Sequence, residues 1–327
     1  MNSMNPFADP VAEAIFANKD VAGLAARSLI NAVLSHGGDP LIGYITELTP
    51  QKVMSSPLTR GYRFDVEARV GNEEIADIEI QFRHMRMNER GLIYAGRFID
   101  DNAKRGEKLS DVLKKMPRVI IINILHFDLR KDHTKFHQPV DLTYRIPTEP
   151  AIEKGKETKG GIIERATDIL TIHNIELIKF TKSILPSLKL QPCYSNKTPS
   201  LHYWLWALCQ AMEENKNVDE VVNLNTALKQ FAQEDEGFRQ YTDRYEIIKS
   251  DERVRREYNI WTEEMSAFED IIARNNTLEA LLAEKDAERE AEKEAFAAEI
   301  AKKDEMLAVI IAERDAILTE LKASRGE

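Results

Sequence analysis

The chain has 327 residues, of which 31% are charged, and a formal net charge of −10. Its length exceeds that of one small core and indicates two or three structural parts. The sequence contains no apolar run of about 18 residues, which a membrane-spanning helix would need, and its first residues lack the pattern of a signal peptide. We therefore expect a cytoplasmic protein without a membrane partner, in which Cys193 and Cys209 are reduced thiols.

The charge is unevenly distributed along the chain. Residues 1–183 contain 26 Lys and Arg against 25 Asp and Glu, whereas the remainder contains 19 against 30. Residues 81–118 alone contain ten basic and five acidic side chains. Lys and Arg supply much of the affinity for nucleic acids by neutralising phosphates. The local excess therefore keeps a DNA partner open, although a solvated helix face explains such a cluster about as often.

The first third of the chain changes from a helical to a strand pattern. Asp9 and Pro10 suit the N-cap and first position of a helix, and apolar residues recur at helical spacing over residues 9–35. From residue 62 to residue 83 apolar and polar residues alternate on either side of Gly71 and Asn72. This pattern predicts a β-hairpin with one apolar and one polar face.

The middle of the chain continues with alternating helix and strand signals. A basic amphipathic helix is predicted at about 86–105, and the run at 118–129 is apolar on both faces, which indicates a central strand. An edge hairpin at about 140–146 and a strand at about 170–180 follow. The order of elements predicts an α/β fold, and from Pro199 onward only helical spacing remains.

The last part of the chain is a charged helical stretch without Gly or Pro, at about 274–324. A heptad repeat can be placed on it, but several of its core positions are charged. The alternatives are a helix that pairs weakly as a coiled coil in its second half and a lone solvated helix. The expected domains are an α/β core at 1–185, a helical domain at 186–273 and a long charged helix at 274–327.

Two carboxylates of the predicted hairpin suit a metal-dependent phosphodiesterase. Such an enzyme needs acidic side chains that hold a hard cation, which activates water and offsets charge on the phosphate oxygens. Asp65 and Glu79 belong to the polar face, and Gln81 shares it because side chains repeat every second residue along a strand. The alternative is a solvent-facing hairpin with ordinary charged residues.

The same segment carries a resemblance to a known family. The passage YRFDVEARVGNEEIADIEIQFR, followed by Arg90, Tyr94 and Arg97 and by a strand ending in ILHFDL, resembles the Rpn family of recombination-promoting nucleases, which are PD-(D/E)XK nuclease family transposases. The resemblance extends over about residues 5–275. It implies a PD-(D/E)XK nuclease-like mixed sheet flanked by helices, and a DNA endonuclease that uses Mg²⁺ or Mn²⁺ and acts in recombination or phage defence.

The resemblance also implies roles for individual residues. Asp65 and Glu79 would be the metal ligands, and Gln81 would stand where the family motif has a lysine. Candidate contacts to DNA phosphate are the basic side chains that follow the hairpin, namely Arg90, Arg97, Lys104 and Arg105. Arg90 and Arg97 share a helix face because they are seven residues apart; the alternative is that they pack against the sheet edge.

The first helix departs from the family pattern. The family begins with a motif resembling Asp-x-x-Phe-Lys-x-x-Phe, whereas Ala12 and Glu13 occupy the Phe-Lys positions here. Either Glu13 adds a carboxylate near the metal, or it stabilises the helix N-terminus through the dipole. The lysine is missing both there and at Gln81, which leaves a second hypothesis open. In it the chain is a catalytically weak or inactive DNA-binding or assembly module that oligomerises through its C-terminal helix.

Two other groups of residues have structural rather than functional interpretations. His126, His133 and His137 include an H-x3-H spacing typical of some zinc sites, but a solvated loop after the central strand is the preferred prediction. Trp204 and Trp206 could stack on bases. Their helical spacing among leucines predicts core positions instead.

Overall fold

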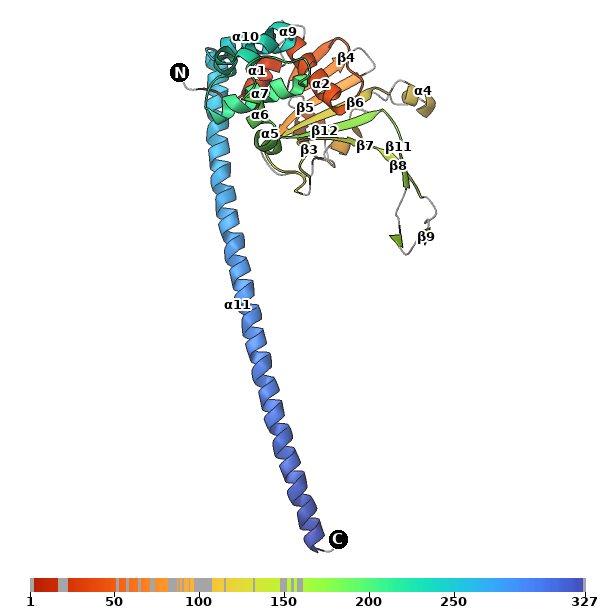
Figure 1. Ribbon diagram of the computed structural model, residues 1–327, viewed down its shortest axis with the longest axis vertical. Helices are drawn as coiled ribbons and strands as arrows, with labels where there is room; N and C mark the ends of the chain where they lie inside the picture. Colours follow the sequence, from red (N-terminus) through yellow and green to blue (C-terminus); the bar gives the residue numbers. More distant parts are fainter. Residues whose placement is uncertain are drawn as a thin grey trace. The chain divides into compact units, whose positions relative to one another are not determined.

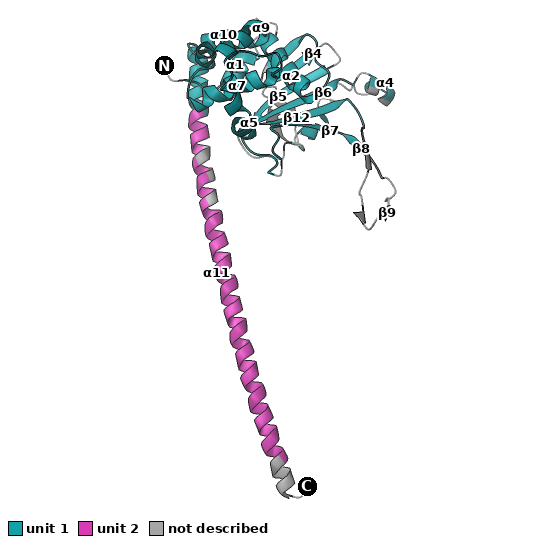
Figure 2. Cartoon of the chain, in the orientation of Figure 1, with its two compact units in different colours: residues 1–261 teal, residues 262–327 magenta. Residues whose placement is uncertain are grey.

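The computed structural model describes most of the chain in two compact units, residues 1–261 and residues 262–327, which are treated separately here (Figure 2). The described residues are 3–16, 23–50, 53–56, 59–63, 66–70, 74–81, 87, 89, 91–93, 95–96, 108–114, 116–131, 133–147, 152–153, 156–157 and 161–325.

A mixed six-stranded sheet forms the centre of the first unit (Figure 1). Its strands, in spatial order, are β1 (Glu47–Pro50), β4 (Val66–Val70), β5 (Glu74–Gln81), β6 (Arg118–Leu125), β12 (Leu170–Glu176) and β7 (His137–Asp141). The three central strands β5, β6 and β12 are parallel, and the remaining neighbours pair antiparallel. β4 and β5 confirm the predicted hairpin, and the apolar run at β6 is the predicted central strand, since all its residues after Arg118 are buried.

Three two-stranded pairings accompany the large sheet. They join β2 (Val53–Ser56) to β3 (Thr59–Arg63), β8 (Thr143–Pro147) to β11 (Gly161–Arg165), and β9 (Ile152–Glu153) to β10 (Lys156–Glu157). The edge hairpin expected at 140–146 is wrong: β7 pairs with β12 and β8 pairs with β11, so the two consecutive strands belong to different sheets.

One face of the large sheet, called here the helical face, carries the larger core. It consists of Ala76, Ile78 and Ile80 of β5 together with buried residues of helices that come from both ends of the unit. The helices that contribute are α1 (Asp9–Phe16), α2 (Leu24–Gly37), α5 (Leu177–Ser183), α6 (Leu185–Leu188), α7 (Ser200–Glu213), α8 (Val218–Leu224), α9 (Thr226–Glu234) and α10 (Glu236–Ile248). Trp204 and Trp206 are fully buried in this core, as predicted.

The opposite face, called here the polar face, has a much smaller apolar core. Ile75, Val119, Ile121, Leu170 and Ile172 form it together with Ala95. The described helical residues between 87 and 96 lie close to this core, because a Cβ atom added at Gly91 would be only 2.7 Å from Ile172 Cδ1. The short α4 (Leu109–Lys114) follows.

The N-terminal helical prediction needs one correction. The structure places two helices, α1 and α2, within the span 9–35 that was predicted as one. Gly23 precedes α2 with φ 65°, a left-handed backbone conformation that does not continue a helix. The periodicity alone did not reveal this boundary, because both helices bury apolar residues in the same core.

The long α11 (Glu252–Arg325) begins in the first unit and continues through the second. Its first turns contribute Val254, Tyr258 and Trp261 to the larger core. No helix in the described part of the chain is both long and apolar enough to cross a membrane. The molecule thus has the predicted class: a mixed sheet flanked by helices, then a helical region and a long C-terminal helix.

Candidate active site

The polar side chains of β5 are buried rather than exposed. Ile75, Asp77 and Glu79 share the polar face because strand residues alternate, and Ile75 packs in the smaller core. Asp77 and Glu79 each have 0% exposure. A solvent-facing hairpin with ordinary surface charges is therefore wrong for these two carboxylates. Burying a carboxylate is costly unless it is compensated, so their position calls for an explanation beyond solubility.

The neighbouring strand β4 adds a third buried carboxylate. Glu67 lies opposite Asp77 in the antiparallel ladder and is 1% exposed. Arg69 Nε donates a hydrogen bond of 2.9 Å to Glu67 Oε1. This guanidinium compensates part of the negative charge that Glu67, Asp77 and Glu79 bring to one face.

On the other side of β5, amides continue the polar face. The parallel ladders align Glu79 with Asn123 of β6, and Asn123 with Asn174 of β12. Both asparagines are 1% exposed, and Asn123 Nδ2 donates a hydrogen bond of 2.8 Å to Asn174 Oδ1. Asn174 in turn pairs with Gln138 of β7. Polar side chains thus cross four adjacent strands in one row.

A lysine and a glutamate lie at the carboxyl end of β12. Glu176 is fully buried, and its Oε2 accepts hydrogen bonds from Leu129 N and Lys179 Nζ, both at 2.8 Å. Lys179 Nζ also donates to Arg130 O at 2.5 Å. Gln138 Nε2 donates to Glu176 Oε1. Contacts from a strand, a loop and a helix thus hold Glu176 and Lys179 in place at the end of the row of polar side chains.

The structure brings together part of the predicted site. Glu79 occupies the centre of the polar face, and Gln81 is the last residue of β5 on the same side by alternation, although its side chain lies outside the described residues. Asp65, Arg90, Arg97, Lys104 and Arg105 also lie outside the described residues. Glu13, half-buried, lies on α1, whose buried neighbours join the larger core.

Sequence reasoning missed the residues that surround Glu79. Asp77 and Glu67 were counted only as alternating polar positions, and Asn123, Asn174, Glu176 and Lys179 were not considered. One signal was available: Asn123 interrupts the run VIIINIL, where a purely structural central strand would be apolar throughout. The partner Asn174 could not be identified without the strand register.

The donors on the polar face have the chemistry that a hard divalent cation prefers, since Mg²⁺ and Mn²⁺ select carboxylate, carbonyl and water oxygens. Among the residues that the structure describes, however, no group of three or more His, Cys, Asp or Glu is arranged to hold a metal ion. A metal bound by Glu79 would therefore need further oxygen ligands from water, from substrate or from residues outside the described part of the chain. The oxygen chemistry fits such a site.

A cluster of histidines lies on the helical face of the sheet. His36 Nδ1 of α2 is 2.7 Å from His137 Nδ1 of β7, and His137 Nε2 is 3.0 Å from His173 Nδ1 of β12. Burial lowers the pKa of His137 to about 3, with further lowering by His173 and His36, and burial lowers the pKa of His173 to about 4. The predicted solvated position is wrong for His137, because this residue begins a strand rather than a loop.

The other two histidines of that prediction differ from each other. His126 packs edge-on against Phe7, with ring centroids 4.9 Å apart, and burial lowers its pKa to about 4. His133 is exposed.

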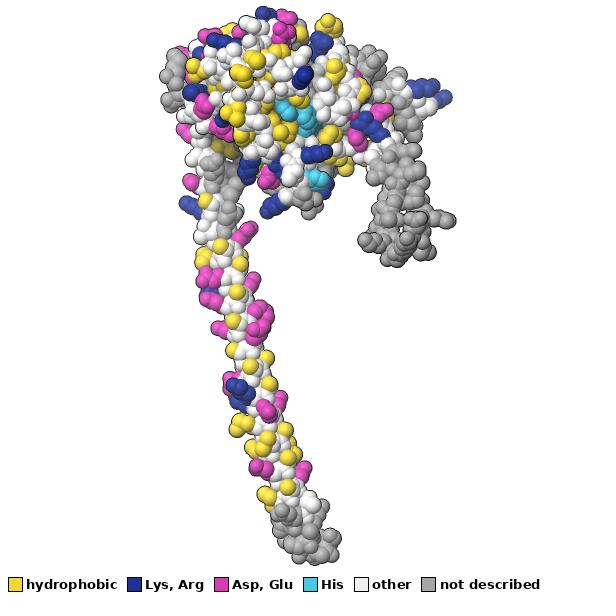
Figure 3. Space-filling model, viewed as in Figure 1, with side chains coloured by type: hydrophobic (Ala, Val, Ile, Leu, Met, Phe, Trp, Pro, Cys, Tyr) yellow, Lys and Arg dark blue, Asp and Glu magenta, His cyan; other side chains and the backbone are white. Residues whose placement is uncertain are grey.

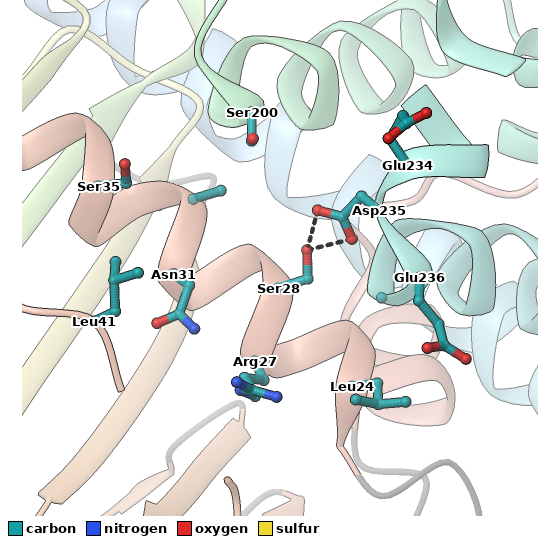
Figure 4. Close-up of a pocket in the computed structure, with 12 residues that line it drawn as sticks. Leu24, Arg27, Ser28, Asn31, Ser35, Leu41, Ser200, Glu234, Asp235 and Glu236 are labelled. Atoms are coloured by element: carbon teal, nitrogen blue, oxygen red, sulfur yellow. Dashed lines mark hydrogen bonds between the residues drawn. The ribbon is translucent and has the colours of Figure 1, made fainter. Parts of the chain in front are cut away.

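A pocket of about 430 Å³ also lies among the helices, and none of the polar-face carboxylates Glu67, Asp77 and Glu79 lines it (Figure 4). Ser28 Oγ in its wall is 2.7 Å from both carboxylate oxygens of Asp235. Asp235 Oδ1 also caps the N-terminus of α10 by accepting a hydrogen bond from Phe238 N at 2.8 Å. Trp204 Nε1 donates to the same hydroxyl at 3.2 Å. These polar groups join α2, α7 and α10, so the wall of the pocket has a structural role.

The candidate site is thus a set of buried carboxylates on the β4–β5 hairpin of a mixed sheet that is flanked by helices. Residues 7–266 match the PD-(D/E)XK nuclease family transposases, and the chain belongs to this family. No curated protein and no solved structure matches it. The fold is accordingly PD-(D/E)XK nuclease-like, and the family associates the chain with nuclease or transposase-type activity. Members of this family typically use divalent metals, and DNA is the substrate that the family implies.

Proposed function

We propose that the protein is a metal-dependent DNA endonuclease that hydrolyses phosphodiester bonds, with Asp65 and Glu79 as ligands of Mg²⁺ or Mn²⁺. The observation that carries this proposal is the complete burial of Glu79 on the polar face. The sequence supports its partner, since Asp65 directly precedes Val66, the first residue of β4, and Val66 pairs with Ile78, the residue before Glu79.

The proposed roles follow from the chemistry of hydrolysis. A bound divalent cation lowers the pKa of water and offsets the charge that grows on the phosphate oxygens. Asp65 and Glu79 hold that cation, and the Gln81 amide orients the attacking water by a hydrogen bond. The water oxygen attacks phosphorus in line and loses a proton to solvent, while the opposite phosphorus–oxygen bond breaks and its oxygen leaves as a hydroxyl after taking up a proton from solvent. Glu13 remains a candidate for a further carboxylate.

The DNA backbone is proposed to contact the basic segment that follows β5. Arg90, Arg97, Lys104 and Arg105 would engage phosphates, which neutralises charge without reading sequence. A DNA substrate suits the cytoplasmic location that we propose. The biological setting in this proposal is recombination of mobile elements or defence against phage.

The second candidate is a DNA-binding or assembly module with weak or no catalysis. The observation that favours it is Gln81 in place of the motif lysine, because a neutral amide stabilises developing phosphate charge less than a cation does. This candidate shares the fold and differs in its chemistry.

Self-association through α11 is compatible with both candidates. Leu307, Ile310 and Ile317 are 57%, 59% and 58% exposed and occupy core positions of one heptad frame. Hydrophobic side chains continue along this part of the helix (Figure 3). We propose that a second copy of the chain covers them, and that the functional division of the chain is 1–185, 186–273 and 274–327.

Cleavage of supercoiled plasmid tests the leading proposal. Wild type is compared with Asp65→Asn and Glu79→Gln, which preserve side-chain size, in Mg²⁺, in Mn²⁺ and in EDTA. The exposed Glu263→Gln, which lies on α11, is the matched control. Nicking that requires metal, survives in the control and disappears in both site variants supports the nuclease. DNA binding by an intact wild type that does not cleave under any of these conditions supports the second candidate.

Self-association has its own test. The mass of the full chain in solution is measured by light scattering beside that of Leu307→Lys/Ile310→Lys. A wild-type oligomer that the double variant dissociates supports the proposal, whereas a monomeric wild type at high micromolar concentration contradicts it.

A further inference from the structure

Two asparagines occupy positions in the sheet where apolar side chains would be expected. Asn123 stands between Ile122 and Ile124 in β6, and Asn174 stands in β12, whose residues are all buried. The two lie opposite each other in the parallel ladder and are hydrogen-bonded through their side chains at 2.8 Å. Their amides are thus paired to each other inside the sheet, with 1% of each residue exposed.

Among the residues that the structure describes, apolar packing gives no reason for an amide pair at this position. A buried amide loses its hydrogen bonds to water, and replacing both partners of a buried hydrogen bond with apolar groups of similar shape is often neutral or stabilising. The preceding residues on the same face, Ile121 and Ile172, show that the position accepts branched aliphatic side chains. A pair of leucines would extend this small core.

The position of the pair next to Glu79 does give a reason. Asn123 is the register partner of Glu79 on β6, and paired residues of adjacent strands lie about 4.8 Å apart and point to the same side. Asn123 Nδ2 uses one N–H in the bond to Asn174. An asparagine amide has two N–H donors, so a second remains for a carboxylate on the neighbouring strand.

The rest of the row restrains Asn174 from the far side. Gln138 pairs with Asn174 across β7 and donates to Glu176, which Lys179 and Leu129 N also bind. Because these partners come from β7, the loop between β6 and β7, and α5, the amide pair is enclosed by several elements. The Asn123 side chain is therefore restrained from the β12 side by its bond to Asn174.

We infer that Asn123, braced by Asn174, is a positioning residue for Glu79: its amide fixes the orientation of that carboxylate and keeps it ready to bind a divalent cation. The inference rests on the proposed function. Carboxylates that bind metals are themselves hydrogen-bonded by an outer set of residues, and loss of such a partner typically weakens metal affinity by about 10- to 100-fold.

The test uses the full chain and Mn²⁺ alone, with binding measured by calorimetry and folding by thermal unfolding without metal. Asn123→Leu/Asn174→Leu removes both amides together, so that neither is left buried without its partner. We expect Mn²⁺ affinity to fall by about 10- to 100-fold, while the metal-free midpoint of unfolding stays the same or rises. A purely structural pair would lower the unfolding midpoint and leave the affinity untouched, which would overturn the inference.

Two further variants keep the outcome interpretable. Asn174→Leu alone leaves the Asn123 amide in place but unbraced, and an intermediate loss of affinity is expected. If the leucine pair does not fold, Asn123→Thr replaces it, because threonine suits a strand but is too short to reach both neighbours. Wild-type affinity in a folded Asn123→Thr protein contradicts the inference.

Failure of the proposed function can be distinguished from failure of the role inferred for Asn123. A folded wild type without Mn²⁺ affinity rules out the metal site itself, whereas a wild type whose affinity is lost in Glu79→Gln but kept in the leucine pair rules out only the role of Asn123.

Discussion

The two faces of the central sheet differ in what they bury. The helical face buries aliphatic and aromatic side chains from helices that precede and follow the sheet strands in the sequence. Burial lowers the pKa of His36, His137 and His173 in the histidine cluster, and of His202 on α7, whose ring centroid is 5.3 Å from that of His36. The polar face buries Glu67, Asp77 and Glu79 beside a small aliphatic core. Buried carboxylates contribute little to stability after desolvation. The difference indicates that the helical face supplies the folding free energy and that the polar face is constrained by chemistry.

The largest effect that this comparison predicts is on the stability of the helical face. Trp204→Ala removes a fully buried ring that packs against Phe238 and Tyr241. We expect the free energy of unfolding to fall by about 3–5 kcal/mol, as measured by chemical denaturation. The fraction that remains folded should cleave DNA at the wild-type rate per molecule. A specific loss of catalysis in that folded fraction would contradict the division between the faces.

The complementary prediction concerns the polar face. Glu79→Gln should lower the rate of plasmid cleavage by about 10²- to 10³-fold, the usual result of removing one group that stabilises developing charge. Its free energy of unfolding should stay near the wild-type value or rise, because a buried charge becomes a neutral amide of the same size. A large loss of stability with normal cleavage by the folded protein would assign Glu79 to the fold instead.

Lowering the pH is a further test of the difference between the two faces, because the buried histidines belong to the helical face. The pKa of His137 is lowered to about 3, and those of His173 and His202 to about 4, against 6.5 for an unfolded histidine. The native state therefore holds these histidines neutral, so their stabilising effect is complete above pH 6.5 and is lost progressively as pH falls toward 4. At pH 5 each of these histidines lowers the free energy of unfolding by about 2 kcal/mol, because the unfolded state binds a proton that the native state does not.

Thermal unfolding between pH 7.5 and pH 5 measures this effect. His137→Asn should flatten the pH dependence, whereas His133→Asn, at an exposed position of the same segment, should leave it unchanged. Equal slopes in wild type and His137→Asn would show that other groups cause acid unfolding.

Much of the fold was predictable from local pattern, but the site was predictable only in part. Alternation identified the hairpin at β4 and β5, and the run around Ile121 identified the central strand, because one face or both faces are apolar. Glu79 could be singled out by motif. Its neighbours could not, since Asn123 meets it only through the β5–β6 register and Asn174 comes from a strand far along the chain. Those contacts depend on strand order, which no local pattern records.

The smallest expected effect comes from a change in the second unit. Side chains along α11 from Thr262 to Thr319, where their burial is described, are exposed with the exception of the half-buried Met265, so a chain ending at Asn275 loses little core. Its three tryptophans, Trp204, Trp206 and Trp261, all lie in the first unit, and their fluorescence therefore reports the unfolding of that unit alone. We expect its free energy of unfolding to change by no more than about 0.5 kcal/mol, as for surface changes in general. A larger loss that depends on protein concentration would instead show that self-association through α11 stabilises the catalytic unit by mass action, and both faces of the sheet would then depend on a partner chain.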